Sequence, residues 1–210
     1  MSAEKKREAG LQRAAEAARE GVSELTEKQY FYAAEFEAEG AWLSFMQREG
    51  WKFAGTDGWK YRFLPCEPED WVYHLDFKEE TGEDEDYVQM YRDYGWECVT
   101  QYGHWFYFRK KRVPGREEDF SIFSDNRSKM EMIERVIQGM VRRSIPLYLL
   151  LMGGEFLVWG TPLLKGNEIA AIVLEIAAIL LLLAVVFGFG IYIGQLDRLQ
   201  KLRAKLDTKA

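Results

Sequence analysis

Residues that commonly carry nucleophilic, acid–base or zinc chemistry are scarce in this chain. It contains two histidines, His74 and His104, and two cysteines, Cys66 and Cys98. His104 falls in phase with apolar strand residues, so this set assembles no histidine triad and no zinc site. Cys66 has no predictable base beside it, and Cys98 takes an apolar strand position. With no phosphate-binding glycine loop in the sequence either, we expect no catalytic residue, no metal and no cofactor, and a protein that is not an enzyme.

Two carboxylates, Glu155 and Glu175, interrupt apolar segments that are otherwise free of charge. The segments are residues 145–164 and 169–193, and each is long enough to cross a hydrocarbon core of about 30 Å as a helix. A carboxyl group inside such a core costs about 3 kcal/mol, so both groups are expected to face protein rather than lipid. Two interpretations are open: a proton or cation site, and a carboxylic acid hydrogen-bonded to a neighbouring helix. The second is favoured, because two carboxylates on two helices do not define a pathway.

The short connection between these segments predicts a hairpin of two transmembrane helices. Arg142 and Arg143 precede the first segment, Arg198 and Arg203 follow the second, and Lys165 is the only Lys or Arg in the connection. Because Lys and Arg are retained on the cytoplasmic side, we expect a multi-pass protein of the cell membrane with both termini in the cytoplasm.

Small and apolar residues near the C-terminus indicate contacts with further helices. Gly190 and Gly194 form a Gly-x-x-x-Gly pair with Gly188 beside it, an arrangement that lets another helix approach closely. Residues 195–210 repeat leucine at three- and four-residue spacing among charges, which predicts a cytosolic amphipathic tail. The expected partners are therefore membrane lipid and either further copies of the chain, in a homo-oligomer, or another membrane protein.

The part of the chain before these segments contains an internal repeat. A shift of 45 residues superposes aromatic and glycine positions in order: Gly50-Trp51 on Gly95-Trp96, Gly58 on Gly103, Tyr61 on Phe106 and Phe63 on Phe108. Each copy, at 29–64 and 71–110, predicts a strand, a helix that ends at the Gly of Gly-Trp, and a hairpin of two strands. The first strands are predicted at 29–33 and 71–77. The fold class is α+β: a duplicated strand-helix-strand-strand cytosolic domain over residues 29–112, followed by the two-helix transmembrane hairpin.

Alternation along the predicted strands assigns two faces to the sheet. The core face, beneath the helices, is expected to hold Trp59, Tyr61, Phe63, Trp71, Tyr73, Leu75, Phe77, His104, Phe106 and Phe108. The opposite face mixes aromatic and charged groups, namely Lys60, Arg62, Val72, His74, Asp76, Trp105, Tyr107 and Arg109. This second face is the predicted ligand or partner face. A small-molecule site and packing against the N-terminal arm, the linker helix or a second subunit stay equally open for it.

The remaining segments are charged or amphipathic. Residues 1–28 form a charged N-terminal arm without the apolar core of a signal peptide, and residues 124–143 predict an amphipathic linker helix that leads into the first apolar segment. The net charge of -6 argues against direct nucleic-acid binding. The dense basic run at 109–112 is interpreted as a solvated strand end that faces anionic lipid.

Three motifs resemble the bacterial DUF2812 family over residues 36–132. They are the repeated helix ending in Gly-Trp, the run Cys-Glu-Pro-Glu-Asp-Trp-Val-Tyr-His-Leu-Asp-Phe at 66–77, and the run Ile-Phe-Ser-Asp-Asn at 122–126. The resemblance implies C-terminal transmembrane helices and a functional linkage to a PadR-type transcriptional regulator, but no defined activity. The long charged arm departs from the family pattern. The paired strand-helix-strand-strand plan is also similar to GyrI-type domains that bind small molecules, an analogy of architecture only.

Two functions follow as hypotheses. In the first, the chain is a membrane-anchored, non-enzymatic sensory or regulatory protein. Its cytosolic domain binds a small molecule or a protein partner, and residues 124–143 couple that domain to the membrane. In the second, the chain is an oligomeric or partner-dependent transport component in which Glu155 and Glu175 act on an ion or proton. An enzymatic alternative would depend on Cys66 or His74.

Overall fold

The structure is a computed structural model that describes residues 23–79, 85–113, 126–160 and 168–208 of the chain. The chain divides into two compact units, Met1–Met132 and Ile133–Ala210. The first unit has the predicted α+β character, with two three-stranded antiparallel sheets, and the second contains a long apolar helix.

Each sheet of the first unit combines a hairpin with one earlier strand. The first sheet has the order β1-β3-β2 and consists of β1 (Leu25–Lys28), β2 (Trp51–Thr56) and β3 (Lys60–Pro65). The second has the order β4-β6-β5 and consists of β4 (Trp71–Phe77), β5 (Glu97–Tyr102) and β6 (Trp105–Lys111). The helical elements are η1 (Ala33–Glu35), α2 (Phe36–Arg48) and α3 (Glu85–Asp93). The order strand, helix, strand, strand therefore occurs twice.

The two hairpins pair in the same way, including one irregularity. The pairing passes from Phe53 opposite Phe63 to Gly55 opposite Arg62 in the first, and from Cys98 opposite Phe108 to Thr100 opposite Tyr107 in the second. Corresponding positions differ by the same 45 residues as the sequence repeat. The predicted glycines at the helix ends are confirmed, because Gly50 and Gly95 have φ angles of 88° and 80°, in the left-handed region that ends a helix.

The first strand lies earlier than its predicted position at 29–33. β1 pairs with β3 so that Lys28 lies opposite Lys60, and it occupies the end of the arm expected over residues 1–28. Beyond Lys28 the chain turns toward α2, and the rings of Tyr30 and Tyr32 pack edge to face at 5.0 Å. These aromatic residues pack against each other instead of extending the backbone pairing.

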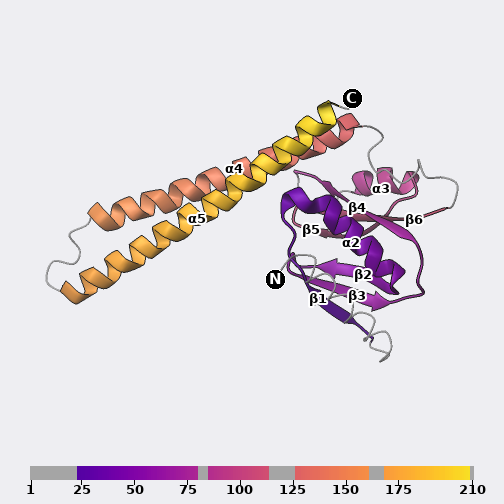
Figure 1. Cartoon of the computed structure of the whole chain (residues 1–210), viewed down its shortest axis with the longest axis horizontal. Coiled ribbons are helices and arrows are strands. Elements are labelled where there is room, and N and C mark those ends of the chain that lie inside the picture. The colour runs from indigo at the N-terminus through magenta and orange to yellow at the C-terminus, as the bar shows by residue number, and fades with distance from the viewer. Residues whose placement is uncertain (1–22, 80–84, 114–125, 161–167, 209–210) are drawn as a thin grey trace. The chain divides into compact units, whose positions relative to one another are not determined.

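Helix α2 lies between the two sheets (Figure 1). On one side, the Trp42 ring packs edge to face on Tyr61 and Phe63 of the first sheet, with ring centroids 5.0 and 5.4 Å apart. On the other side, Ser44 Oγ accepts a hydrogen bond of 2.8 Å from the backbone N–H of Tyr73 in the second sheet. One helix therefore supplies core contacts to both sheets.

The second sheet is covered on both faces, which corrects the predicted division into a core face and a ligand face. The odd-numbered residues of β4 lie opposite the odd-numbered residues of β6, with Tyr73 opposite Arg109, and this face packs on α2. The even-numbered residues form the other face, which α3 covers with the Tyr91 ring 4.2 Å from that of Phe108. Alternation within each strand is as predicted, except that Trp59, which was expected in the core, lies before β3 and is 53% exposed. The register between antiparallel strands, however, decides which alternating sets share a face.

Two long helices, α4 (Asn126–Gly160) and α5 (Glu168–Asp207), form the C-terminal part of the chain. The predicted linker helix and first apolar segment overlap α4, and the second segment and tail overlap α5. Arg203 pairs with Glu134, and the Phe189 ring lies 5.1 Å from that of Tyr148. Because these partners run in opposite directions along the chain, the two helices contact each other in antiparallel orientation.

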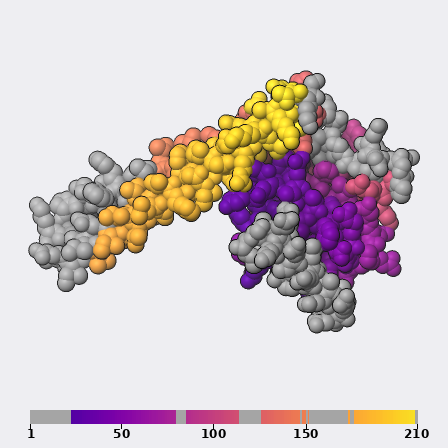
Figure 2. All heavy atoms as spheres, in the orientation of Figure 1, coloured from indigo at the N-terminus to yellow at the C-terminus, as the bar shows by residue number. Residues whose placement is uncertain are grey.

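Helix α5 is the membrane candidate. Within the described residues, one stretch, Ile176–Asp207, is long and apolar enough to cross a membrane. Its apolar part has a mean hydropathy of 2.8, and 6% of that part is buried. Figure 2 shows this stretch as a continuous orange-to-yellow surface, and Leu180 and Phe187 are 62% and 73% exposed. This composition indicates membrane association. The two-helix, multi-pass arrangement stays a prediction.

Gly40 sets the distance between α2 and β4. An added Cβ there would lie 2.6 Å from the carbonyl oxygen of Tyr73, and that oxygen belongs to a strand held by its pairing with β6. We expect Gly40→Ala to destabilise the first unit by about 1–2 kcal/mol net, because the helix must move away from the strand even though alanine favours helix. Tryptophan-fluorescence melts of the purified chain in detergent measure the change.

The matched control is Gly194→Ala, another helical glycine, where nothing among the described residues lies within 4 Å of the added Cβ. The same propensity gain without the steric conflict should leave the melt of the first unit unchanged. Equal melts for Gly40→Ala and wild type would contradict the close approach of α2 to β4.

Candidate functional site

The residues predicted for a ligand or partner face lie on three different surfaces. Lys60 and Arg62 are on the outer face of the first sheet, Val72, His74 and Asp76 are on the face that α3 covers, and Trp105, Tyr107 and Arg109 are on the face that packs on α2. Asp76, Tyr107 and Arg109 are buried, with 2, 3 and 5% of their surface exposed. The structure therefore does not bring these residues together, and their buried members contact other parts of the protein.

A buried polar cluster joins α2 to both sheets. Glu39 of α2 is 6% exposed, and its Oε1 accepts hydrogen bonds from Tyr61 Oη at 2.7 Å and Tyr107 Oη at 2.8 Å. The Phe53 ring packs beside both tyrosines, with centroids 6.0 and 5.3 Å away. No Lys or Arg of the described residues pairs with this carboxyl group. The negative charge is therefore held by hydroxyl donors alone.

This environment shifts the titration of the cluster. Burial raises the pKa of Glu39, and the hydrogen bonds from the two tyrosines oppose that shift without cancelling it. Burial, followed by the negative charge of Glu39, raises the pKa of Tyr61 and Tyr107, so both hydroxyls remain protonated donors. The cluster can take up a proton, but its two hydroxyl donors are committed inside the protein.

A second buried carboxylate connects α3 to its sheet. Asp76 Oδ2 accepts hydrogen bonds from Tyr87 Oη at 2.6 Å and Tyr91 Oη at 2.5 Å, and its Oδ1 accepts one from the backbone N–H of Phe77 at 2.7 Å. Each half of the unit thus contains one buried acidic side chain that accepts hydrogen bonds from two tyrosine hydroxyls. Asp76, like Glu39, is committed to the interior.

Arg109 is a buried cation with a partner of its own. It contacts Glu97 through Nε at 2.9 Å and through Nη2 at 2.6 Å, and its guanidinium carbon lies 4.4 Å from the centroid of the Trp71 ring. Burial alone would lower the pKa of Arg109, but hydrogen bonds to Glu97 and Tyr73 raise it above its ordinary value. The group is therefore a structural cation rather than part of an open binding face.

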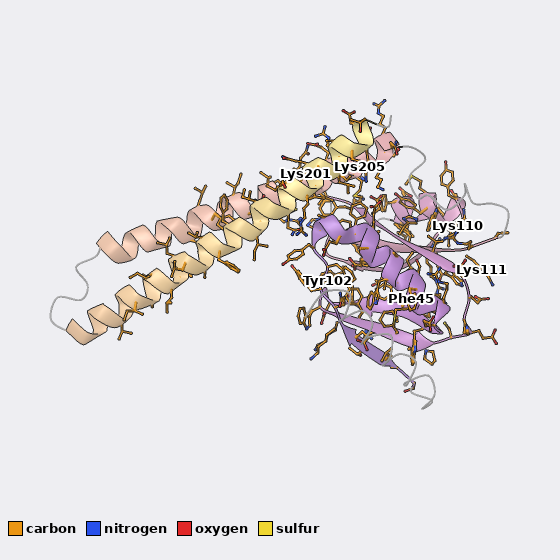
Figure 3. The ribbon with its side chains drawn as sticks, viewed as in Figure 1. Phe45, Tyr102, Lys110, Lys111, Lys201 and Lys205 are labelled. Carbon is orange, nitrogen blue, oxygen red and sulfur yellow. The ribbon has the colours of Figure 1, made fainter. Side chains whose placement is uncertain are left out.

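The rest of the predicted basic run is also paired. Lys111 pairs with Glu69, and Arg112 lies 3.2 Å from Asp70. Lys110 donates a hydrogen bond of 2.8 Å to the carbonyl oxygen of Tyr94. Figure 3 shows Lys110 and Lys111 at the end of the first unit away from Tyr102. These contacts argue against the interpretation of 109–112 as a free basic face for lipid.

Neither cysteine has the environment of a nucleophile. Cys66 Sγ accepts a hydrogen bond of 3.2 Å from Gln47 Nε2, and burial raises the pKa of both Cys66 and Cys98. A raised pKa disfavours the thiolate, which is the reactive form. In the described part of the chain, no group of three or more His, Cys, Asp or Glu residues is placed to hold a metal ion.

A pocket of about 700 Å³ lies between α3 and β5. It is lined by Glu85, Asp86, Val88, Gln89, Arg92, Cys98, Thr100, Gln101 and Phe106. Charged groups of both signs stand beside apolar walls, and amides and a hydroxyl add donors and acceptors. Unlike the two buried carboxylate clusters, this pocket presents its polar groups on an accessible concave surface. It is the candidate binding site of the first unit.

The intramembrane predictions meet the structure only in part. The side chains of Glu155 and Glu175 lie outside the described part, although the backbone at these positions belongs to α4 and α5, so the proton or cation site stays a prediction. A Cβ added at Gly188 would lie 3.8 Å from Tyr148 Oη. At Gly190 and Gly194 it would meet no atom of the described residues within 4 Å. As far as the described residues go, that part of the glycine face leaves room for another helix.

Sequence reasoning missed Glu39 as a central polar residue. Glu39 stands at helical spacing with Trp42, Leu43 and Met46, so it is an acidic residue within the apolar stripe of α2. That departure from the pattern was the available signal. Glu97 had no comparable signal, because its contact with Arg109 depends on the pairing of β5 with β6.

Because burial raises the pKa of Glu39 in the folded chain, the folded state binds a proton more readily than the unfolded state. The resulting stabilisation is fully present below the unfolded carboxyl pKa of about 4.3, and it is lost as pH rises through the folded pKa. We expect Glu39→Gln, which mimics the protonated group, to become more stable relative to wild type as pH rises. Urea unfolding in detergent at a series of pH values measures the difference.

Glu49→Gln, which makes the same change of side chain at the exposed end of α2, is the matched control. Parallel pH curves for wild type and Glu39→Gln would show that Glu39 does not titrate differently in the folded and unfolded states.

Comparison with known proteins identifies a family but no individual relative. The family described as "Protein of unknown function (DUF2812)" matches residues 35–144. No curated protein and no solved structure matches the chain. The matched residues include α2, α3 and strands β2 to β6, and therefore both carboxylate clusters and the pocket. Since they make up more than half of the 210 residues, the protein belongs to the DUF2812 family, as its motifs predicted.

Proposed function

We propose that this protein is a membrane-anchored, non-enzymatic regulatory protein whose cytosolic α+β unit binds a small molecule in the pocket between α3 and β5. The observation that carries the proposal is the pocket itself. Its volume of about 700 Å³ is in the range of small-molecule sites, and charged, amide and hydroxyl side chains line it together with the apolar Val88, Cys98 and Phe106. The buried carboxylates Glu39 and Asp76 are weaker candidates, because tyrosine hydroxyls already surround them.

We infer that the two halves of the first unit arose by duplication. The pocket of the second half then corresponds to the surface around Phe53 in the first half, which the second sheet covers. The 45-residue shift relates Cys98 of the pocket to Phe53 of the first half. Phe53 is fully buried, and its ring packs 6.2 Å from Tyr73 and 5.3 Å from Tyr107 of the second sheet. In the second half, Cys98 is smaller than phenylalanine and only partly buried. This substitution supports a space that a ligand occupies.

Residue chemistry favours a small molecule over a further protein layer in this pocket. The same shift relates Glu85 of the pocket to Gly40, the residue whose missing side chain lets α2 approach β4. A glutamate at this position keeps a second backbone at a distance and adds charge. A small polar ligand does not need that close approach of two backbones, so it fits the site better than a sheet does.

The membrane part of the proposal is supported by α5. We propose that α4 and α5 cross the membrane as a hairpin with both termini cytoplasmic, and that residues 124–143 transmit ligand binding to it. The open glycines Gly190 and Gly194 fit contacts with a second copy or another membrane protein. A PadR-type regulator is the proposed downstream link, through function rather than direct contact.

The pocket proposal is tested by restoring the side chain that the first half has. Cys98→Phe is expected to fill the space between α3 and β5 and to weaken ligand binding at least about tenfold, because the occupant loses its apolar wall. Ligand-observed NMR with a library of small amines, amides and carboxylates on the detergent-purified chain supplies the binding measurement.

Cys98→Val, which stays small, is the matched control and should keep the hits found with wild type. Hits that bind Cys98→Phe as well as wild type would place the ligand elsewhere, and a library without saturable hits would count against a small-molecule site of this chemistry.

A further inference from the structure

The outer face of the first sheet concentrates positive charge. Lys28 lies directly opposite Lys60, and Lys52 and Arg62 belong to the same face. Among the described residues, no acidic side chain forms an ion pair with any of these four. Directly opposed like charges destabilise a sheet, so the Lys28 and Lys60 pair has no structural benefit. The arrangement therefore favours contact with an anionic partner.

Nearby acidic residues do not neutralise this face. The Asp57 carboxylate accepts hydrogen bonds from the backbone N–H groups of Lys60 at 2.7 Å and Trp59 at 3.0 Å, and these bonds lower the pKa of Asp57. Glu24 is exposed just before β1. Within the described residues, Asp57 and Glu24 therefore leave these four basic side chains without an ion-pair partner, although the net charge of the chain is -6.

Exposed aromatic side chains stand at one end of the basic face. Tyr30, Trp59 and Tyr102 are 52, 53 and 43% exposed, and the ring centroids of Tyr30 and Trp59 are 6.2 Å apart. Tyr102 lies against the β2–β3 turn, since a Cβ added at Gly58 would be 2.6 Å from its ring. Tyrosine and tryptophan side chains with apolar bodies and polar tips favour the headgroup region of a membrane.

The repeat argues against a second copy of the chain as the occupant. On the duplication proposed above, Lys60 and Arg62 correspond to Trp105 and Tyr107 of the second sheet. Trp105 stacks on Phe36 and Tyr107 donates a hydrogen bond to Glu39, so these positions bury aromatic rings against a helix. With lysine and arginine in their place, the first sheet is built for an anionic, hydrated surface instead.

We propose that this basic face, with its aromatic end, docks on the anionic phospholipid headgroups of the membrane that holds α5. A basic side chain near an anionic bilayer changes the docked-to-undocked ratio about fivefold, so Lys60 and Arg62 together contribute about thirtyfold. Because α5 would attach the chain to the membrane, the lipid concentration near the basic face is high, and a weak contact is sufficient for docking. The docking is independent of the pocket ligand.

The test uses the full chain in nanodiscs with a fluorophore on the basic face. Both native cysteines are replaced by serine, and Thr26→Cys carries the label, because Thr26 is exposed directly opposite Arg62. Nitroxide on lipid headgroups quenches the fluorophore when the face is docked. We expect strong quenching in discs that contain phosphatidylglycerol, little in phosphatidylcholine alone, and release by high salt.

The variant Lys60→Gln/Arg62→Gln should lower the docked-to-undocked ratio about thirtyfold. The matched control is Arg48→Gln/Arg112→Gln, which removes the same charge from two residues that already pair with Asp70, and it should dock as wild type does. Equal quenching in both lipids, or quenching unaffected by the Lys60 and Arg62 changes, would overturn the proposal. Quenching that appears only with two chains per disc would assign the face to self-association instead.

Discussion

The placement of one helix between two sheets is the constraint on which the first unit depends. Helix α2 packs Trp42 on the first sheet and brings Gly40 to the backbone of β4 in the second. The second sheet carries α3 on its other face, so both of its faces are buried. Side chains that alternate outward on an isolated sheet therefore lie inside the protein, where each polar group needs a hydrogen-bond partner.

The buried polar groups show how this constraint is met. Glu39 and Asp76 are each surrounded by two tyrosine hydroxyls, and Arg109 is held by Glu97 and the ring of Trp71. Leaving one partner of such a contact unpaired costs about 1–3 kcal/mol. These networks therefore allow the polar groups to be buried, and they also fix the positions of the helices and strands. Their chemistry is structural, and binding chemistry is left to the surfaces that the packing leaves open.

Those open surfaces differ in charge and shape. The concave one lies between α3 and β5 and carries Glu85 and Asp86 beside the apolar Val88 and Phe106. The other is the outer face of the first sheet, whose basic residues form no ion pair with any described acidic residue. The proposed ligand pocket and the proposed lipid-docking face are separate surfaces of the same unit, and both fit the proposed regulatory role.

The sequence by itself determined the family and most of the elements, although the first strand lies at Leu25–Lys28 and not at 29–33. The shift of 45 residues, the glycines that end the helices and the alternation within strands depend on local periodicity and backbone conformation, which are written in consecutive residues. The tertiary structure alone decided which strand faces meet, because register and layer order depend on contacts between distant segments. For that reason Asp76, Tyr107 and Arg109 were predicted on an open face and lie buried, whereas Lys60 and Arg62 lie on the outer face of a sheet that has no second helix against it in the described residues.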